Sequence, residues 1–149
     1  EDAYKFLKNK STTEHRFEKV EIINGTRFIN DSKSTNFHSV SSASERVKNA
    51  LLIMHGITKN IPTSELQLSN EIKKIIIPKD MNLDHNLFNC EVEVIKSIFE
   101  LEDILKKDFQ RFETVLFSCG GSSFNDFENY IERGKFFKSI VKNLKGGQN

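Results

Sequence analysis

Short apolar runs alternate with segments of helical spacing along this chain of 149 residues, and this alternation most constrains its fold. The run at residues 50–54, Ala-Leu-Leu-Ile-Met, has no polar position on either side. Such a run is typical of a strand buried on both faces of a sheet. Strands that alternate with helices favour a mostly parallel sheet with helices on both faces and right-handed crossovers. The sequence therefore predicts an α/β fold with buried strands at residues 50–54, 74–77, 91–95 and 114–118.

A hairpin is predicted ahead of these strands. Asn24-Gly25 is a strong signal for a two-residue turn, and it separates strand-like segments at residues 17–23 and 26–30. Because hairpin strands are antiparallel, this pair would form an antiparallel edge on the otherwise parallel sheet.

Helical patterns fill the intervals between the predicted strands. The closing helix carries one apolar stripe, and Asn125 and Glu128 have the spacing of a capping pair at its start. Gly134 lies inside this helix, where glycine costs about 1 kcal/mol relative to alanine. We therefore expect a neighbouring element to approach closely at Gly134. The other predicted helices cover residues 1–10, 36–49, 63–72, 83–88 and 98–109.

Composition limits the classes of function. The 22 Lys and Arg residues nearly balance the 21 Asp and Glu residues, so the net charge of +1 gives no support to binding of nucleic acid or an anionic membrane. Cys90 and Cys119 have no metal-ligand spacing, so both are expected to be reduced. No apolar run approaches the ~20 residues of a membrane span, and no signal peptide is recognisable. We expect a cytoplasmic protein and, because the chain opens on Glu1, a fragment or a processed chain.

Three polar loops follow predicted strands, at residues 31–36, 55–60 and 118–124. Because ligands bind at the carboxyl ends of the strands in open parallel sheets, these loops are expected to meet in one site. They supply lysines, hydroxyls and an acid, which together could hold a carboxylate or a phosphate near a helix N-terminus. The alternative for the first loop is an ordinary strand–helix junction with an N-cap at Thr35 or Asn36.

Several catalytic and binding motifs are missing from the sequence. There is no GxxxxGK[ST] phosphate loop, no GxGxxG fingerprint and no GxSxG nucleophile elbow. The four histidines, at positions 15, 38, 55 and 85, form no ligand cluster in the sequence, and no metal ligand is assigned.

Four motifs resemble the C-terminal domain of the Mur ligases, nearest to the members that add D-glutamate. They are His15-Arg16, residues 30–36 (Asn-Asp-Ser-Lys-Ser-Thr-Asn), Ser122-Ser123-Phe124, and residues 129–134 (Asn-Tyr-Ile-Glu-Arg-Gly). Their order and spacing match across nearly the whole chain. The resemblance implies a Rossmann-like, three-layer α/β domain at residues 13–149, preceded by the end of a helix or linker at 1–12.

The resemblance also implies an activity. Mur ligases of this kind are ATP-dependent and join D-glutamate to UDP-N-acetylmuramoyl-L-alanine through an acyl phosphate during peptidoglycan synthesis. The UDP-binding domain and the central ATPase domain, with the Mg²⁺ ligands, are not in this sequence. This chain alone is therefore expected to be inactive, and the whole enzyme is expected to be a monomer.

By resemblance, five residues form the D-glutamate site. Thr35, Lys59 and Ser123 would hold the carboxylates, beside the backbone around Phe124 and the ring of Tyr130. A dicarboxylate needs a cation, hydroxyls and backbone N–H groups, so this residue set suits the expected substrate.

By the same resemblance, Arg16, Asp31 and Lys33 would face the nucleotide. Lys33 is the predicted catalytic residue, because an ammonium group near a transferring phosphoryl group stabilises its charge. Asp31 could accept a ribose hydroxyl.

The sequence departs from the family pattern in two loops. The turn that carries Lys59 usually reads GGDGK, but residues 55–59 here read His-Gly-Ile-Thr-Lys. Residues 119–121 are Cys-Gly-Gly where the family often has proline and alanines, and Asn125 stands where Asp is usual. Three alternatives stay open: a ligase that adds another amino acid, including a folylpolyglutamate synthase-like enzyme; a ligand-binding module without catalysis; or a purely structural domain.

Overall fold

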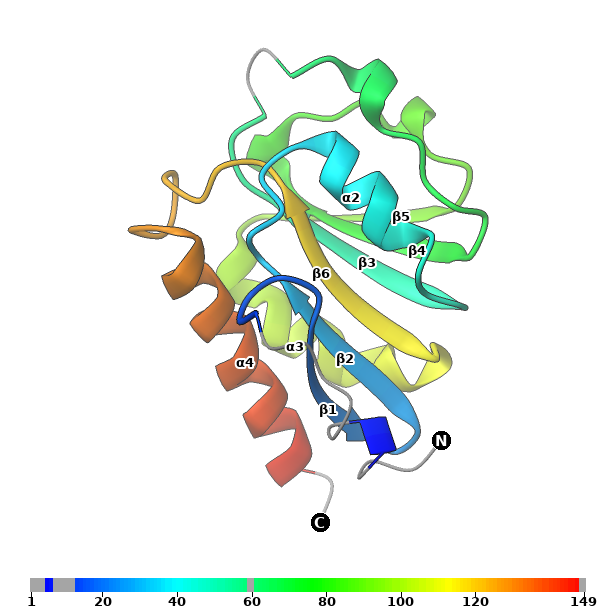
Figure 1. Cartoon of the computed structure of the whole chain (residues 1–149), viewed down its shortest axis with the longest axis vertical. Helices are drawn as coiled ribbons and strands as arrows, with labels where there is room; N and C mark the ends of the chain where they lie inside the picture. Colours follow the sequence, from blue (N-terminus) through cyan, green and yellow to red (C-terminus); the bar gives the residue numbers. More distant parts are fainter. Residues whose placement is uncertain (1–4, 7–12, 59–60, 148–149) are drawn as a thin grey trace.

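The computed structural model describes residues 5–6, 13–58 and 61–147, and in this part of the chain six strands form one twisted sheet (Figure 1). The strand order is β1-β2-β6-β3-β4-β5. Only the β1–β2 pair is antiparallel, and the other four pairings are parallel. The predicted sheet and its antiparallel edge are thus confirmed. The strands are β1 (Glu18–Ile23), β2 (Thr26–Asp31), β3 (Ala50–His55), β4 (Ile72–Pro78), β5 (Glu91–Ile95) and β6 (Thr114–Gly120).

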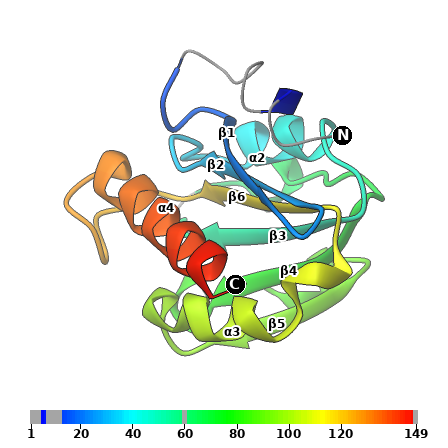
Figure 2. The ribbon, with the colours of Figure 1, turned by 90° about the horizontal axis from the view of Figure 1, so that it is seen from below.

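Helices cover both faces of the sheet, as expected (Figure 2). Helix α2 (Phe37–Ser44) lies on one face, and α3 (Leu101–Asp108) and α4 (Tyr130–Gly146) lie on the other. The strand residues alternate between two hydrophobic cores: Val115 and Phe117 pack toward α3 and α4, whereas Leu116 packs toward α2. This alternation explains the continuous apolar runs, because both neighbours in the sequence face a core.

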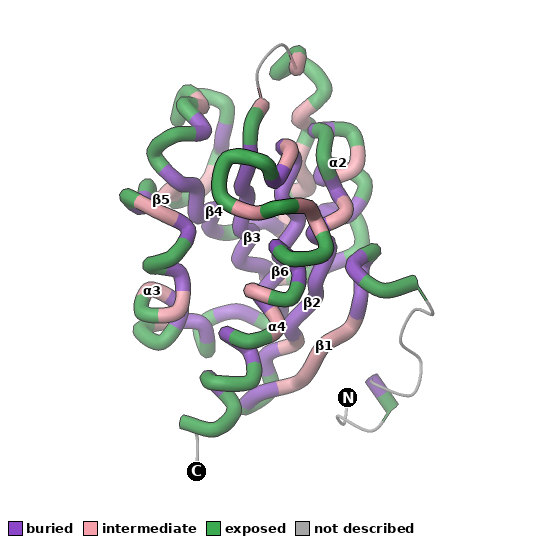
Figure 3. Tube along the Cα trace, turned by 90° about the vertical axis from the view of Figure 1, so that its left-hand side faces the viewer, coloured by how far each residue is buried: buried purple, intermediate pink, exposed green. Residues whose placement is uncertain are grey.

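Burial decreases from the centre of the sheet to its edges (Figure 3). Strands β3 and β6 are buried along their whole length, whereas β1 and β5 at the edges are only partly buried. Both cysteines are free thiols; Cys119 is buried on β6 and Cys90 is half-buried. Burial raises the pKa of the Cys119 thiol to about 12, so it stays protonated at neutral pH.

The predicted helix at residues 63–72 is wrong. Only a 3-10 turn, Thr63–Glu65, forms there. The backbone after this turn bonds to α2 instead: Gln67 N donates to Ser41 Oγ (2.9 Å) and Ser69 N donates to Ser44 Oγ (3.1 Å). The serine hydroxyls of α2 thus satisfy N–H groups that a helix would have bonded to its own carbonyls.

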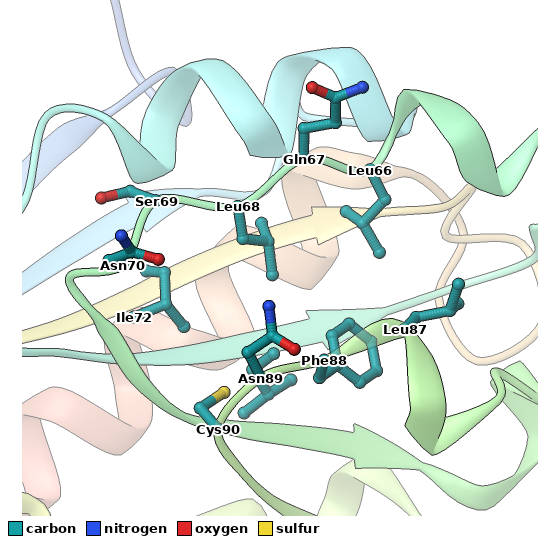
Figure 4. Close-up of a pocket in the computed structure, with 11 residues that line it drawn as sticks. Leu66, Gln67, Leu68, Ser69, Asn70, Ile72, Leu87, Phe88, Asn89 and Cys90 are labelled. Atoms are coloured by element: carbon teal, nitrogen blue, oxygen red, sulfur yellow. The ribbon is translucent and has the colours of Figure 1, made fainter.

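A cavity of about 210 Å³ lies where that helix was expected (Figure 4). Leu66, Leu68 and Ile72 line it from one segment, and Phe88 lines it from the opposite one.

Three other predicted helices differ in extent. The helix expected at 36–49 is α2, which is shorter and has Asn36 as its N-cap, with Asn36 Oδ1 accepting from Ser39 N at 2.9 Å. The segment at 98–109 is a 3-10 turn, Ile98–Glu100, followed by α3 and a second 3-10 turn. Near 83–88 only the 3-10 turn His85–Leu87 forms. The expected helix at 1–10 lies mostly outside the described residues, which include only Lys5 and Phe6 there.

The capping pair predicted for the closing helix is also wrong. Helix α4 begins one turn later, with Asn129 as the N-cap; its Oδ1 accepts from Glu132 N at 2.9 Å. Asn125 instead donates from Nδ2 to Asp80 Oδ2 at 3.2 Å. The same Asn-x-x-Glu spacing occurs at both places, and the sequence alone does not distinguish them.

The close approach expected at Gly134 is confirmed. A Cβ atom at this position would lie 2.0 Å from His15 Nδ1 and 2.6 Å from Ser32 Oγ. The His15 ring is buried and bonded to Asn30 Nδ2 at 2.8 Å, so it has little freedom to move away. Helix α4 can therefore pack against the loop after β2 only because residue 134 has no side chain.

This packing predicts the effect of one substitution. We expect Gly134→Ala to lower the free energy of unfolding by about 2 kcal/mol, because overpacking outweighs the gain in helix propensity. Gly146→Ala in the same helix is the matched control, since a Cβ there meets nothing within 4 Å. It should raise stability by up to about 1 kcal/mol. Urea denaturation of both variants measures the difference, and equal effects would contradict the packing argument.

Candidate functional site

The three polar loops meet at the carboxyl ends of β2, β6 and β3, which are neighbours in the sheet (Figure 1). Asp31 pairs with Ser118, and His55 pairs with Gly120, so the three strands end at the same level. Gly120 N then donates to Ser34 O at 2.9 Å. The expected convergence of the loops is confirmed.

Two backbone hydrogen bonds join the loop after β3 to the loop after β6. Ile57 N donates to Ser122 O (2.9 Å), and Ser122 N donates to Ile57 O (3.1 Å). Gly56 makes this bridge possible, because its φ is +123° and a Cβ there would lie 2.3 Å from Ser122 O. Gly56 thus allows the backbones of the two loops to approach closely.

A buried arginine connects the three loops. Arg133 of α4 is completely buried, and its guanidinium donates to a carbonyl in each loop: Ser32 O (2.7 Å), Gly121 O (2.9 Å) and His55 O (3.2 Å). Its Nε atom has no hydrogen-bond partner in the part of the chain that the structure describes. A buried charge is costly unless it is bonded in this way, so the loops and the guanidinium stabilise one another.

Sequence reasoning included Arg133 only as part of the Arg-Gly motif and gave it no role. A signal was nevertheless present, since Arg133 stands in line with Phe137, Ile140 and Leu144 on the apolar stripe of α4. A cation at a core position of a helix indicates a buried, bonded role.

His55 connects Arg133 to the loop after β6. Its Nδ1 lies 3.2 Å from Arg133 Nη1, and its Nε2 lies 2.8 Å from Asp126 Oδ2. Burial, together with the Arg133 charge, lowers the pKa of His55, although the Asp126 hydrogen bond acts in the opposite direction. Sequence reasoning noted His55 at the start of the second polar loop, among four unclustered histidines and in a turn that departs from the family pattern, but gave it no role.

Arg16, Asp31 and Lys33 line one recess of about 300 Å³ together with residues of α2. The structure thus brings the three predicted nucleotide residues together. Arg16 is exposed on a turn between His15 (φ +66°) and Phe17 (φ +44°). Two non-glycine residues in the left-handed region are strained, so this turn must be held by other contacts.

Asp31 provides one of those contacts. Its Oδ1 accepts from Phe17 N at 2.9 Å, and its Oδ2 accepts from Ser118 Oγ at 2.7 Å. Burial raises the pKa of this carboxyl, and the two hydrogen bonds partly oppose that shift. Asp31 therefore anchors the turn that presents Arg16. A ribose hydroxyl that bonded to Asp31 would have to share a carboxylate oxygen that already accepts a hydrogen bond within the protein.

Sequence reasoning missed two further residues of this recess. The Arg46 guanidinium carbon lies 3.7 Å from the centre of the Phe17 ring, which adds a cation beside Arg16. Ser34 Oγ is buried and has no hydrogen-bond partner among residues 5–6, 13–58 and 61–147. Arg46 had no signal in the sequence, because the segment after α2 and the turn at Phe17 are brought together only by the fold. Ser34 stands in the motif at residues 30–36 but was given no role there.

The residues predicted for the amino-acid substrate lie around the same end of the sheet. Thr35 is exposed beside the α2 N-cap, Ser123 is buried, and Phe124 is 71% exposed. The Lys33 ammonium lies 5.6 Å from the centre of the half-buried Tyr130 ring, so Lys33 and Tyr130 are adjacent. Lys59 lies outside the described residues.

Within residues 5–6, 13–58 and 61–147, no three His, Cys, Asp or Glu side chains are grouped as a metal site requires. Among the same residues, none of the helices has the length and apolar character needed to span a bilayer.

Comparison with known proteins gives homologues over nearly all of the chain. No family model matches. The chain is 38% identical to the UDP-N-acetylmuramoylalanine–D-glutamate ligase of Thermosipho africanus, over 96% of the chain and 35% of that protein. It is 35% identical to the ligase of the same name from Thermosipho melanesiensis, over 99% of the chain and 36% of that protein. For the ligase from Christiangramia forsetii the identity is 36%, over 88% of the chain and 31% of that protein.

The predicted resemblance is confirmed by these matches. The chain spans about a third of the length of these three relatives, each of which is a ligase of the MurD type. It is therefore homologous to a portion of these enzymes.

The role of Arg133 yields a stability prediction. We expect Arg133→Met to lower the free energy of unfolding by about 3–5 kcal/mol, because it leaves three loop carbonyls without their donor. The matched control is Lys135→Met in the same helix, whose exposed ammonium lies 3.6 Å from Glu132. It should differ little from the unsubstituted protein. Guanidinium chloride denaturation compares the two, and a stable Arg133→Met protein would show that the loops do not depend on the guanidinium.

Proposed function

We propose that this chain is the C-terminal, amino-acid-binding domain of an ATP-dependent ligase that adds D-glutamate to UDP-N-acetylmuramoyl-L-alanine. The observation that carries the proposal is the meeting of three polar loops at one end of the sheet, in a chain homologous to D-glutamate ligases over nearly its whole length. The domain would contribute to peptidoglycan synthesis in the cytoplasm, as part of a monomeric enzyme.

The proposed reaction has two steps. The γ-phosphoryl group of ATP is transferred to the precursor's carboxylate, which gives an acyl phosphate and ADP. The D-glutamate amine then attacks the carbonyl carbon, phosphate leaves, the nitrogen loses a proton and an amide bond forms. ATP and Mg²⁺ would be held mainly by the central domain of the enzyme, so this domain alone would be inactive.

The proposed nucleotide-facing group consists of Arg16, Asp31 and Lys33, which share one recess. Two cations near the transferring phosphoryl group stabilise the charge that develops on its oxygens. Asp31 serves by holding the Arg16 turn and could also accept a ribose hydroxyl. Lys33 is assigned the catalytic role because its ammonium group would stabilise the charge of the phosphoryl group; it lines this recess and lies beside Tyr130.

The proposed D-glutamate group consists of Thr35, Lys59, Ser123, the backbone at Phe124 and the ring of Tyr130. Hydroxyls and an ammonium suit two carboxylates. Support comes from the neighbouring positions of the loops, which are joined by the Ile57–Ser122 bridge and by Arg133.

Other ligases remain the alternative within the same class, either one that adds a different amino acid or a folylpolyglutamate synthase-like enzyme. A binding module without catalysis is the alternative from another class. Phosphate release measured with a panel of amino acids distinguishes these possibilities.

The first test is an amino-acid panel on the intact ligase that contains this domain. With ATP, Mg²⁺ and UDP-N-acetylmuramoyl-L-alanine, phosphate release should depend on D-glutamate. Release with a different amino acid would retain the ligase class and change the substrate, whereas no release with any amino acid would favour the binding module.

Lys33→Ala in the intact enzyme tests the catalytic assignment. Because the ammonium acts on the transferring phosphoryl group, we expect kcat to fall by at least about 100-fold, equivalent to ~2.7 kcal/mol of the barrier. The control is Lys48→Ala, an exposed lysine that does not line this recess. A kcat within about twofold of the unsubstituted enzyme would make Lys33 only a loop residue.

Lys59→Ala tests the amino-acid site. Removal of a charge partner should raise the KM for D-glutamate by about tenfold or more, with little change in the KM for ATP. Steady-state kinetics with each substrate varied in turn gives both constants. An unchanged KM for D-glutamate would contradict the assignment.

A further inference from the structure

His55 is a completely buried imidazole that lies between a cation and a carboxylate. Arg133 Nη1 approaches Nδ1 at 3.2 Å, and Asp126 Oδ2 approaches Nε2 at 2.8 Å. A guanidinium can only donate hydrogen bonds, so Nδ1 must be the acceptor. The ring proton therefore sits on Nε2 and is donated to Asp126. The two neighbours together select one tautomer of a neutral ring.

The charged groups that face His55 come from three elements. Arg133 belongs to α4, Asp126 to the loop after β6, and Asp80 to the 3-10 turn Lys79–Met81. Burial has the largest effect on the pKa of His55 and lowers it, and Arg133 acts in the same direction. The two carboxylates oppose the shift without reversing it. The neutral ring that the hydrogen bonds require is thus also the favoured form.

Asp126 belongs to the turn that carries two of the proposed substrate residues. Asp126 N (3.2 Å) and Phe127 N (2.9 Å) both donate to Ser123 O. The Phe127 ring packs edge-on against the His55 ring, with the ring centres 5.4 Å apart. Within this turn Ser123 is buried and Phe124 is 71% exposed. His55 therefore attaches the turn to the end of β3 through both a hydrogen bond and a ring contact.

We propose that His55 is a positioning residue, which as the neutral Nε2–H imidazole links Arg133 to Asp126 and so holds the Ser123–Phe124 turn in place for the amino-acid substrate. This inference rests on the proposed function for the identity of the substrate. The chain of contacts from Arg133 through His55 to Asp126, called the relay below, depends only on the described residues. His55 touches no reacting atom and acts through the turn.

The relay has a defined response to acid. Protonation places a second proton on Nδ1, which then points a donor at the donors of Arg133, so the contact becomes repulsive. Because the pKa in the folded protein lies below the unfolded value of 6.5, the contribution of His55 is complete above about pH 6.5 and is lost as the pH falls through the lower value. Other groups, including buried His15, also titrate below pH 6.5. The pH dependence of the KM for D-glutamate is therefore compared between the unsubstituted enzyme and its His55 variants.

Three substitutions separate the two halves of the relay. His55→Phe keeps the ring volume and removes both nitrogens. His55→Gln can place an amide donor near the Nε2 position, and His55→Asn can place an acceptor near the Nδ1 position. If the link to Asp126 positions the turn, Phe and Asn should both raise the KM for D-glutamate by about tenfold, and Gln should restore most of the loss. The KM for ATP should stay within about twofold in all three.

The control is His85→Phe, which replaces an exposed histidine on the 3-10 turn His85–Leu87 and should leave both KM values unchanged. As the pH falls through the pKa of His55 in the folded enzyme, which lies below 6.5, the KM for D-glutamate should rise more steeply in the unsubstituted enzyme than in His55→Gln. Equal pH profiles, a Gln variant no better than Phe, or a parallel loss in both KM values would overturn the positioning role.

A second measurement tests the relay without an activity assay. In the intact protein labelled with ¹⁵N-histidine, the His55 ring should show an unprotonated Nδ1 and a protonated Nε2 at neutral pH. Its resonances are identified by their absence in His55→Gln or His55→Phe. The opposite tautomer or a doubly protonated ring would overturn the inference. If D-glutamate is not a substrate of the unsubstituted enzyme, the proposed function fails, and this measurement still decides the relay.

Discussion

A single guanidinium group determines how the ends of three strands are arranged. Among the described residues Arg133 forms no ion pair with a carboxylate; instead it donates to the carbonyls of Ser32, His55 and Gly121. Carbonyl dipoles compensate a buried cation only if they are fixed in direction, so the guanidinium and the loops require each other. Arg133 thus holds the loops that are proposed to bind the substrate, although it does not itself need to contact the substrate.

A second buried cation of the same domain shows a different solution. Lys74 on β4 is also buried, but three carboxylates surround it, with Glu93 at 2.8 Å, Asp108 at 3.2 Å and Glu91 at 3.5 Å. Those acids raise the pKa of Lys74 against the effect of burial. Arg133 is linked to a carboxylate, that of Asp126, through the His55 ring. Carboxylates close to Arg133 would also place negative charge under loops that are proposed to bind a dicarboxylate, so the use of neutral carbonyls is consistent with that proposal.

The sequence predicted the sheet well because its pattern has a direct physical cause. Runs such as residues 50–54 face a core on both sides, and Asn24-Gly25 suits only a tight turn. The helix at 63–72 was mispredicted for a reason that local pattern does not contain: the hydroxyls of Ser41 and Ser44 on α2 bond the N–H groups of that segment. These hydroxyls lie about 25 residues away in the sequence. The helical periodicity of residues 63–72 therefore carries no information about them.

The site was predictable in its location and only partly in its composition. The polar residues after β2, β3 and β6 gave the location, since neighbouring parallel strands must end together. The left-handed turn around Arg16, the anchoring role of Asp31 and the stacking of Arg46 on Phe17 depend on contacts between elements distant in the sequence. Asp31 illustrates the general difficulty: a carboxylate in a polar loop reads as a ligand-binding group, but both of its oxygens are bonded inside the protein. Its effect on a nucleotide would therefore act largely through the position of Arg16, the exposed cation that it holds in place.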